Sequence, residues 1–345
     1  MQKFFLGANS EAGFYSLYDG FCADKGDFLH LIKGGPGCGK SGFMRKIAKA
    51  AEEKGFEVEY ILCSGDPDSL DGIYIPELKC GYADATAPHV LEPRHFGVDS
   101  DYVNLGRFCS EPPADEIKLY TERYKSCYER AYSLLRAAGA VKSAPHPELI
   151  GDADILKVKR RASSAANRAL GAPCGDGKVN KRFIRGISCT GDIVLSETLS
   201  VLCKQIWLLD NRLGLAKHYL QELIDCAAER GDDIIICPSP LMPGIPEAVI
   251  FPRQKLGFIS GDIMDIENPW RHVRLDAIIS PEKLRAHKSE LKKAEKLYTC
   301  IMDSVFLSLS EAKHWHDELE AAYKPHIDFA ALDEFTESEI NKLFA

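Results

Sequence analysis

Residues 28–41 read Phe28-Leu-His-Leu-Ile-Lys-Gly-Gly-Pro-Gly-Cys-Gly-Lys-Ser41 and decide the fold of the first half of the chain. Residues 28–32 are apolar enough for a short buried strand. After the glycine-rich loop, residues 41–54 carry apolar residues at helical spacing. Gly55 then follows the helix, as glycine often does just beyond a C-terminus. Strand, loop and helix in this order are the context in which the pattern G-x-x-x-x-G-K-[ST] predicts a phosphate-binding loop.

The chemistry of this loop follows from its residue types. Glycines let the backbone turn tightly, so that successive N–H groups point at the phosphates, and the helix N-terminus adds further donors. Lys40 is expected to reach the β- and γ-phosphates, and the Ser41 hydroxyl is expected to ligate Mg²⁺. The predicted nucleotide-binding residues are Gly34, Gly35, Pro36, Gly37, Cys38, Gly39, Lys40 and Ser41.

A second metal ligand is predicted at Asp84, which ends the strand-like run Cys80-Gly-Tyr-Ala-Asp84. Such a site usually needs an acidic residue at the end of a nearby strand. Thr86 and His89 are then expected at the mouth of the site, where His89 orients water or senses the γ-phosphate. An ordinary turn aspartate and a loop histidine are the structural alternatives. The acidic run 66–71 is either a second source of a carboxylate or simple turn chemistry.

The nucleotide is predicted to be ATP by elimination. A GTPase is expected to carry Asn-Lys-x-Asp for the guanine base, and neither Asn-Lys pair, at 180–181 and 341–342, continues in that way. Cys38 lies beside Lys40 and the helix N-terminus, and both are expected to lower its pKa and make the thiol reactive.

The composition argues against three other classes of protein: nucleic-acid-binding, disulfide-rich and membrane proteins. A formal net charge of −8 argues against a large nucleic-acid-binding surface. The 12 cysteines include no C-x-x-C pair, so we expect free thiols in a reducing cytoplasm. No stretch approaches the length of a membrane span, and no signal peptide is recognisable at the start. The sequence therefore predicts a cytoplasmic protein without a membrane partner.

The second half of the sequence repeats the first at nearly constant spacing. Lys40 aligns with Lys217, and Gly37 with Gly214. Three further pairs follow one residue later in register: Pro76 with Pro252, Lys79 with Lys255, and Gly81 with Gly257. The matched loop reads Asn211-Arg-Leu-Gly-Leu-Ala-Lys-His218, and Asp84 falls opposite Ser260. Because most loop glycines and both proposed metal ligands are missing, the second copy is expected to keep the fold without hydrolysing nucleotide.

Helical sequence follows each copy, at 114–140 and at 281–323. A basic segment at 157–161 is either a solvated helix face or a lid that brings Arg160 or Arg161 to phosphate. An arginine of the second copy could also stabilise phosphate charge on the first, as in other two-module proteins. The candidates are Arg212, Arg253, Arg271 and Arg274.

The chain resembles a bacterial family described as tandem-module P-loop ATPases or nucleotide kinases. The resemblance rests on residues 4–9, 33–41, 68–72, 75–78 and 84–89, and it covers the first half well and the second half as a pattern. It implies ATP binding and names no substrate. In similar proteins the second module usually keeps an intact phosphate loop, which this chain lacks.

Together these observations predict an α/β fold of two tandem P-loop NTPase-like modules with parallel sheets, each with a helical appendage, at 1–178 and 179–345. The expected function is an ATPase that uses Mg²⁺ in the first module, with a structural or regulatory second module. The alternatives are a small-molecule or nucleotide kinase and an ATP sensor that does not hydrolyse. An unidentified protein partner is compatible with all three.

Overall fold

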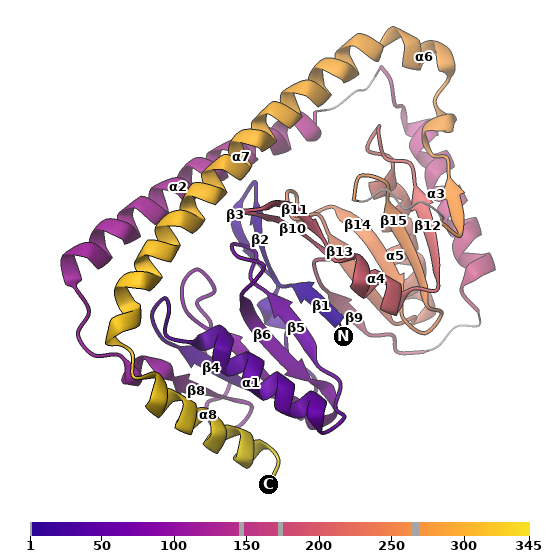
Figure 1. Ribbon diagram of the computed structural model, residues 1–345. Helices are drawn as coiled ribbons and strands as arrows, with labels where there is room; N and C mark the ends of the chain where they lie inside the picture. Colours follow the sequence, from indigo (N-terminus) through magenta and orange to yellow (C-terminus); the bar gives the residue numbers. More distant parts are fainter. Residues whose placement is uncertain (1, 145–147, 172–174, 264–268) are drawn as a thin grey trace.

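The computed structural model describes residues 2–144, 148–171, 175–263 and 269–345. It contains two six-stranded mixed sheets, helices on their outer faces, and a long pair of helices along one edge (Figure 1). No helix among the described residues is long and apolar enough to cross a membrane.

The first sheet has the strand order β1-β5-β6-β7-β4-β8. Its strands are β1 (Gln2–Phe5), β4 (Phe28–Lys33), β5 (Glu59–Leu62), β6 (Leu70–Ile75), β7 (Cys80–Asp84) and β8 (Ser100–Asn104). A hairpin of β2 (Gly7–Ser10) and β3 (Gly13–Ser16) stands beside it, and α1 (Lys40–Glu53) follows β4. The predicted strand 28–32, helix 41–54 and strand 80–84 are therefore confirmed, each to within one residue.

The second sheet repeats this arrangement, with the order β16-β12-β15-β14-β13-β9. Its strands are β9 (Val179–Lys181), β12 (Gln205–Leu209), β13 (Ile234–Pro238), β14 (Pro246–Phe251), β15 (Leu256–Ser260) and β16 (Arg271–Val273). A hairpin of β10 (Arg185–Ser188) and β11 (Gly191–Val194) matches β2–β3, and α5 (Ala216–Arg230) matches α1. The extra helix α4 (Ser196–Leu202) precedes β12.

The expectation of parallel sheets is wrong for one strand in each sheet. Strand β6 runs antiparallel to β5 and β7, and β14 runs antiparallel to β13 and β15. The reason is the length of the connections, because a parallel pair needs a crossover of a dozen or more residues. Only residues 76–79, with the 3₁₀ turn η2 (Pro76–Leu78), join β6 to β7. So short a link permits only an antiparallel neighbour.

Matched residues of the two halves also share their backbone conformation. Gly37 and Gly214 have φ of +70° and +69°, and Lys79 and Lys255 have φ of +51° and +50°. A Cβ on Gly81 would lie 3.0 Å from the sulfur of Cys22, and one on Gly257 would lie 2.8 Å from the sulfur of Cys203. The sequence alignment of the halves therefore coincides with equivalent positions in space.

The helical segments that follow each sheet are exchanged between the halves. The first segment consists of α2 (Ala114–Lys142) and α3 (Asp152–Ala169), and α3 packs on α5 of the second sheet. The second consists of α6 (Pro281–Ala286), α7 (Lys288–Tyr323) and α8 (Phe329–Leu343), and α8 packs on α1 of the first sheet. Helices α2 and α7 lie side by side along their length (Figure 1). The helices that follow the first sheet in sequence therefore cover the second sheet, and those that follow the second sheet cover the first.

The two sheets also share one buried core. Phe4, Leu31 and Ile61 of the first sheet belong to the same apolar cluster as Ile235 and Ile259 of the second. The backbones of Phe5 and Phe183 exchange two hydrogen bonds of 2.9 Å across the boundary. Separate clusters bury α1 and α8 on the outer face of the first sheet and α3 and α5 on that of the second. The order of layers is thus helices, sheet, sheet, helices.

Candidate functional site

The loop between β4 and α1 turns through two left-handed glycines. Gly37 has φ of +70° and Gly39 has φ of +80°, a conformation that costs glycine little and other residues more. The backbone N–H groups of Gly37, Gly39, Lys40 and Ser41 donate to no acceptor among the described residues. Four unpaired donors at a helix N-terminus form a cradle suited to an anion.

Lys40 lies at the opening of this cradle. Its ammonium donates to the carbonyls of Gly34 at 2.8 Å and Gly35 at 3.0 Å, and it lies 3.5 Å from Asp84 Oδ2. The other oxygen of Asp84 accepts from the hydroxyl of Thr86 at 2.5 Å and from its backbone N–H at 2.8 Å. Thr86 therefore fixes the carboxylate so that Oδ2 faces Lys40.

The Ser41 hydroxyl faces the segment that leads into β6. Its oxygen accepts a 3.0 Å hydrogen bond from the backbone N–H of Leu70. That bond orients the side chain and leaves a second lone pair on the oxygen. Asp66, in the same segment, instead pairs with Lys313 of α7 at 3.5 Å. The structure thus brings Lys40 and Asp84 together and places Asp66 in a contact with the long helix.

His89 lies behind this group in a buried ion pair. Its Nε2 atom is 3.0 Å from Asp71 Oδ2, and the two side chains are each 6% exposed. Burial is the largest single effect on the pKa of His89 and lowers it, but the charge and hydrogen bonding of Asp71 together with the charge of Asp84 raise the pKa above its usual value. The imidazole is therefore biased toward its charged form, and its Nδ1 atom has no partner among the described residues.

Asp71 is the residue of this site that the sequence indicated least clearly. It stood in the acidic run 66–71, where turn chemistry was an equal interpretation. The signal that distinguishes it is its place inside β6, where an aspartate is buried to 4% exposure. The sulfur of Cys63 completes a compact group with Asp71 and His89, all within 4.8 Å of one another.

The exchanged helices α7 and α8 approach the outside of the loop. A Cβ on Gly37 would lie 3.2 Å from the carbonyl oxygen of Glu320, near the end of α7. A Cβ on Gly39 would lie 2.7 Å from the side chain of Leu332 in α8. The loop glycines therefore serve close packing as well as backbone geometry. No pattern near the loop in sequence could have shown these distant neighbours.

The expected reactivity of Cys38 is wrong. Its side chain is buried, with 2% of the residue exposed, and burial raises its pKa although the charge of Lys40 opposes the shift. The sequence showed the nearby cation and helix terminus but not the burial of the thiol.

The matched loop of the second half uses its backbone amides differently. The amide of Gly214 donates to the Asn211 carbonyl at 3.0 Å, and that of Ala216 donates to the Asn211 side chain at 2.9 Å. The amide of His218 donates to Leu215 at 3.2 Å. These are the counterparts of Gly37, Gly39 and Ser41, whose amides are unpaired.

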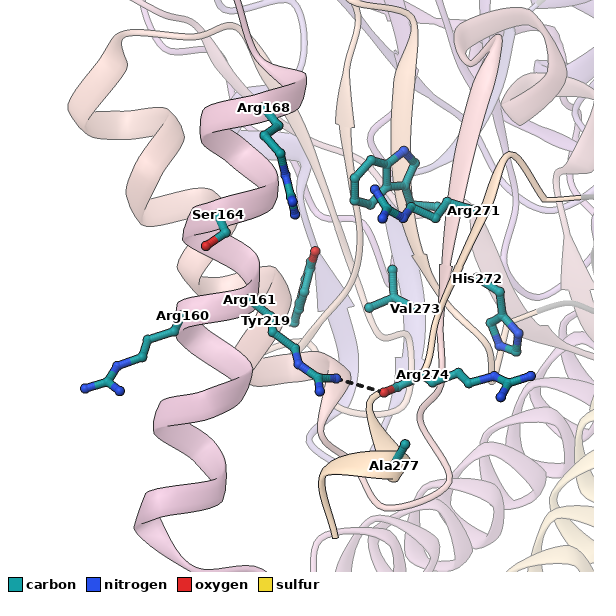
Figure 2. Close-up of a pocket in the computed structure, with 11 residues that line it drawn as sticks. Arg160, Arg161, Ser164, Arg168, Tyr219, Arg271, His272, Val273, Arg274 and Ala277 are labelled. Carbon is teal, nitrogen blue, oxygen red and sulfur yellow. Dashed lines mark hydrogen bonds between the residues drawn. The ribbon is translucent and has the colours of Figure 1, made fainter.

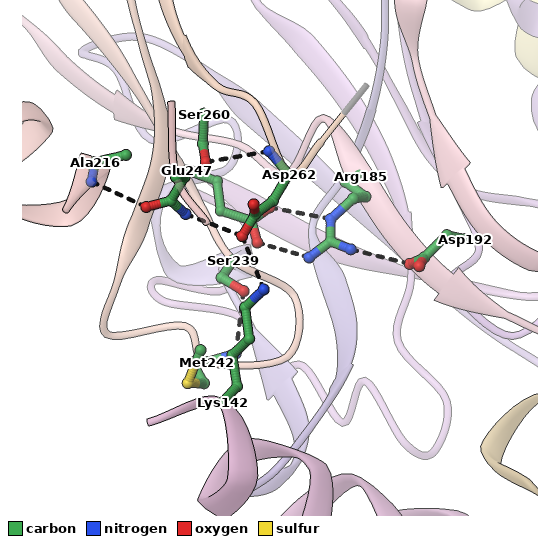
Figure 3. Close-up of polar contacts among 10 residues, drawn as sticks. Lys142, Arg185, Asp192, Ala216, Ser239, Met242, Glu247, Ser260 and Asp262 are labelled. Carbon is green, nitrogen blue, oxygen red and sulfur yellow. Dashed lines mark hydrogen bonds and ion pairs between the residues drawn. The ribbon is translucent and has the colours of Figure 1, made fainter. Parts of the chain in front are cut away.

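A chain of side chains holds this second loop closed. Asn211 also donates to Asp262 at 2.9 Å, and Asp262 pairs with Lys142 at the end of α2 at 2.9 Å (Figure 3). Asp262 stands where Thr86 stands in the first half, two residues beyond the strand end. The loop lines a cavity of about 790 Å³ that also contains Asp210 and Asp276. Lys142, Arg212 and Lys217 line the same cavity, so its charges are mixed.

The four candidate arginines of the second half lie in different places. Arg271 and Arg274 line a hollow beside α3, together with Arg160 and Arg161 of the basic segment. Arg212 lies in the cavity of the second loop, and Arg253 is exposed after β14. Among the described residues, none of these arginines makes a hydrogen bond or ion pair with residues 34–41.

No protein-family model matches the chain, and neither a curated protein nor a solved structure matches it. The functional argument therefore rests on the geometry of the site.

Proposed function

We propose that the chain binds MgATP in the loop 34–41 and hydrolyses it there, while the second half serves a structural or regulatory role. The observation that carries the proposal is the set of unpaired amides at Gly37, Gly39, Lys40 and Ser41. These residues are half-buried, and a phosphate chain supplies the acceptors that their amides lack. The paired amides of the second loop support confining the chemistry to the first half.

The side chains around the cradle suit a triphosphate with its metal. The Lys40 ammonium can exchange its two carbonyl partners for phosphate oxygens. Ser41 Oγ and Asp84 Oδ2 are oxygen donors of the kind that Mg²⁺ prefers, and the Thr86 bonds leave Asp84 Oδ2 available. When bound, Mg²⁺ neutralises charge on the β- and γ-phosphates.

His89 acts in this proposal as a fixed positive charge and a hydrogen-bond donor. Its raised pKa favours the imidazolium ion, which Asp71 stabilises at 3.0 Å. A charged imidazole is a poor base, so sensing the γ-phosphate suits His89 better than deprotonating water.

The test compares the same substitution in the two loops. Lys40→Ala removes a charge-assisted contact, so MgATP affinity measured by calorimetry should fall about tenfold or more. Lys217→Ala, the matched control, should leave the affinity unchanged. If Lys40→Ala binds MgATP like the parent chain, the loop 34–41 is not the nucleotide site.

Turnover decides between hydrolysis and its alternatives. The full chain with MgATP alone should release inorganic phosphate, and Lys40→Ala should abolish that release. ADP formation that requires an added acceptor identifies a kinase instead. Tight binding without turnover in either case identifies an ATP sensor.

A further inference from the structure

A second, separate hollow of about 610 Å³ lies between α3 and the edge strand β16 of the second sheet (Figure 2). Among the described residues its lining contains no carboxylate, although the whole chain has a net charge of −8. Five arginines line it: Arg160, Arg161, Arg168, Arg271 and Arg274. Such a concentration of one charge in an acidic protein calls for a function.

Three of the arginines lie near Tyr219 of α5, and their charges act on its pKa: Arg161 and Arg168 from α3, and Arg271 from β16. In Figure 2 the side chain of Arg168 points toward the Tyr219 hydroxyl, whereas that of Arg161 points away from it, toward the carbonyl of Arg274. Arg161 donates to the carbonyl of Arg274 at 3.1 Å, and Arg271 lies 4.7 Å from the centre of the Trp207 ring. These contacts hold both guanidinium groups in place without neutralising their charge.

Within the part of the chain that the structure describes, no carboxylate pairs with the arginines of the hollow. Arg168 and Arg271 have no hydrogen-bonded or ionic partner among the described residues, and neither do Arg160 and Arg274 through their side chains. Burial raises the pKa of Tyr219 to about 12, although Arg271, Arg168 and Arg161 oppose the shift. Its hydroxyl therefore remains a hydrogen-bond donor at neutral pH.

The corresponding place in the first half carries other side chains and charges. There His30 and Asp101 form a 2.7 Å pair at the strand positions that Trp207 and Arg271 occupy in the second sheet. Phe335 of α8 stacks on Phe43 of α1, with ring centres 6.1 Å apart. The cluster of arginines beside α3 therefore does not follow from the shared fold.

We propose that this hollow binds a polyphosphate group, either inorganic or as part of a nucleotide. A ligand with two or three closely spaced phosphates matches several arginines that line one hollow better than a monoanion does. The volume suits one small ligand. A long nucleic acid is disfavoured because its further phosphates must cross the acidic remainder of the surface.

The experiment uses full-length protein with Lys40→Ala, which weakens the other phosphate site at the loop 34–41 about tenfold or more, and the binding that depends on Arg168 and Arg271 is assigned to the hollow. Sodium tripolyphosphate is titrated by calorimetry at fixed ionic strength. Arg168→Gln and Arg271→Gln should each weaken binding about tenfold or more. Arg253→Gln, an exposed arginine of the same half outside the hollow, should leave it unchanged. Circular dichroism checks that the variants fold, which their exposed positions favour.

Competition identifies the source of the phosphates. Displacement by pyrophosphate and by ADP to similar extents supports a site for the polyphosphate itself, and stronger displacement by ADP supports a nucleotide. Absence of tripolyphosphate binding, or equal weakening by Arg253→Gln, overturns the proposal. It is also overturned if a single-stranded oligonucleotide binds more tightly than tripolyphosphate through the same two arginines.

Discussion

The loops at 34–41 and 211–218 occupy the same place in two sheets of the same strand order, yet they use their backbone amides differently. In the first loop the amides of Gly37, Gly39 and Ser41 are unpaired, and in the second loop their counterparts are paired internally. The side chain of Asn211, in place of Gly34, accepts from one of these amides, whereas the amides of Gly214 and His218 donate to the backbone carbonyls of Asn211 and Leu215. Two sheets of the same strand order can therefore carry loops that differ in the donors left for a ligand.

The largest expected effect is on the rate of ATP hydrolysis, and it tests Asp84, the strand-end residue that is replaced by Ser260 in the second half. Asp84→Asn removes the carboxylate that Thr86 orients, so we expect the rate of ATP hydrolysis to fall about a hundredfold or more. Nucleotide affinity should change far less, because the cradle amides remain. Phosphate release and calorimetry measure the two quantities. Asp66→Asn is the control, and the metal assignment moves to Asp66 if that variant loses Mg²⁺ dependence instead.

A smaller effect, on the free energy of unfolding, is expected from a substitution of Gly39, which has a left-handed backbone conformation in the first loop. Gly39→Ala introduces the residue that the second half carries at Ala216, but here φ is +80° and Leu332 lies 2.7 Å from the new Cβ. We expect the free energy of unfolding to fall by about 1–3 kcal/mol in denaturant titration. Gly13→Ala, at φ of +95° with open space around it, isolates the backbone part. Equal losses in both variants would show that the contact with α8 is unimportant.

The next prediction concerns a substitution that removes hydrogen bonds from the second loop. Asn211→Ala leaves the Ala216 amide without an acceptor and releases Asp262 from one partner. The free energy of unfolding should fall by about 1 kcal/mol, as for the loss of a helix cap. In the Lys40→Ala background, Asn211→Ala should add no MgATP binding beyond what Lys40→Ala alone retains, because the amides of Gly214 and His218 stay paired with backbone carbonyls. A new binding site there would show that Asn211 alone keeps the second loop inactive.

The smallest effect concerns Asp276 in the cavity of the second loop. Burial, and then the charge of Asp210, raise the pKa of Asp276 to about 6, from 3.8 for the ordinary group. Between these values the folded chain binds a proton that the unfolded chain has released, so stability decreases as pH rises from about 4 to about 6. Because the carboxyl is partly exposed, we expect about 1 kcal/mol. Denaturant titrations of Asp276→Asn across this range should lose that part of the slope.

The sequence predicted the elements that are local in the chain. The strand at β4, the helix α1 and the position of Asp84 follow from periodicity and from a motif that spans few residues. The antiparallel direction of β6 was missed because a pattern of apolar residues does not encode strand direction. The short link 76–79 does encode it, because it is too short for a parallel crossover. The burial of Cys38 and the contacts of Glu320 and Leu332 were beyond reach, because helices hundreds of residues away create them. The exchange of the helical segments between the two halves could not be predicted for the same reason.

The helix pair α2–α7 has a mechanical consequence. Helix α7 has 36 residues, which corresponds to about 54 Å. Near its middle, Met302, Val305 and Leu309 pack with Ile187 of β10 and Leu241, and this contact is a natural pivot. One end of the pair touches the first loop through Glu320, and the other touches the second through Lys142. A tilt of about 5° moves Glu320, about 22 Å from the pivot, by about 2 Å, and it moves Lys142, which lies beside Tyr298 about 10 Å from the pivot, by about 1 Å in the opposite direction. A displacement at the first loop therefore changes the separation of Lys142 and Asp262 at the second loop, and no ligand at the second loop is needed for that change.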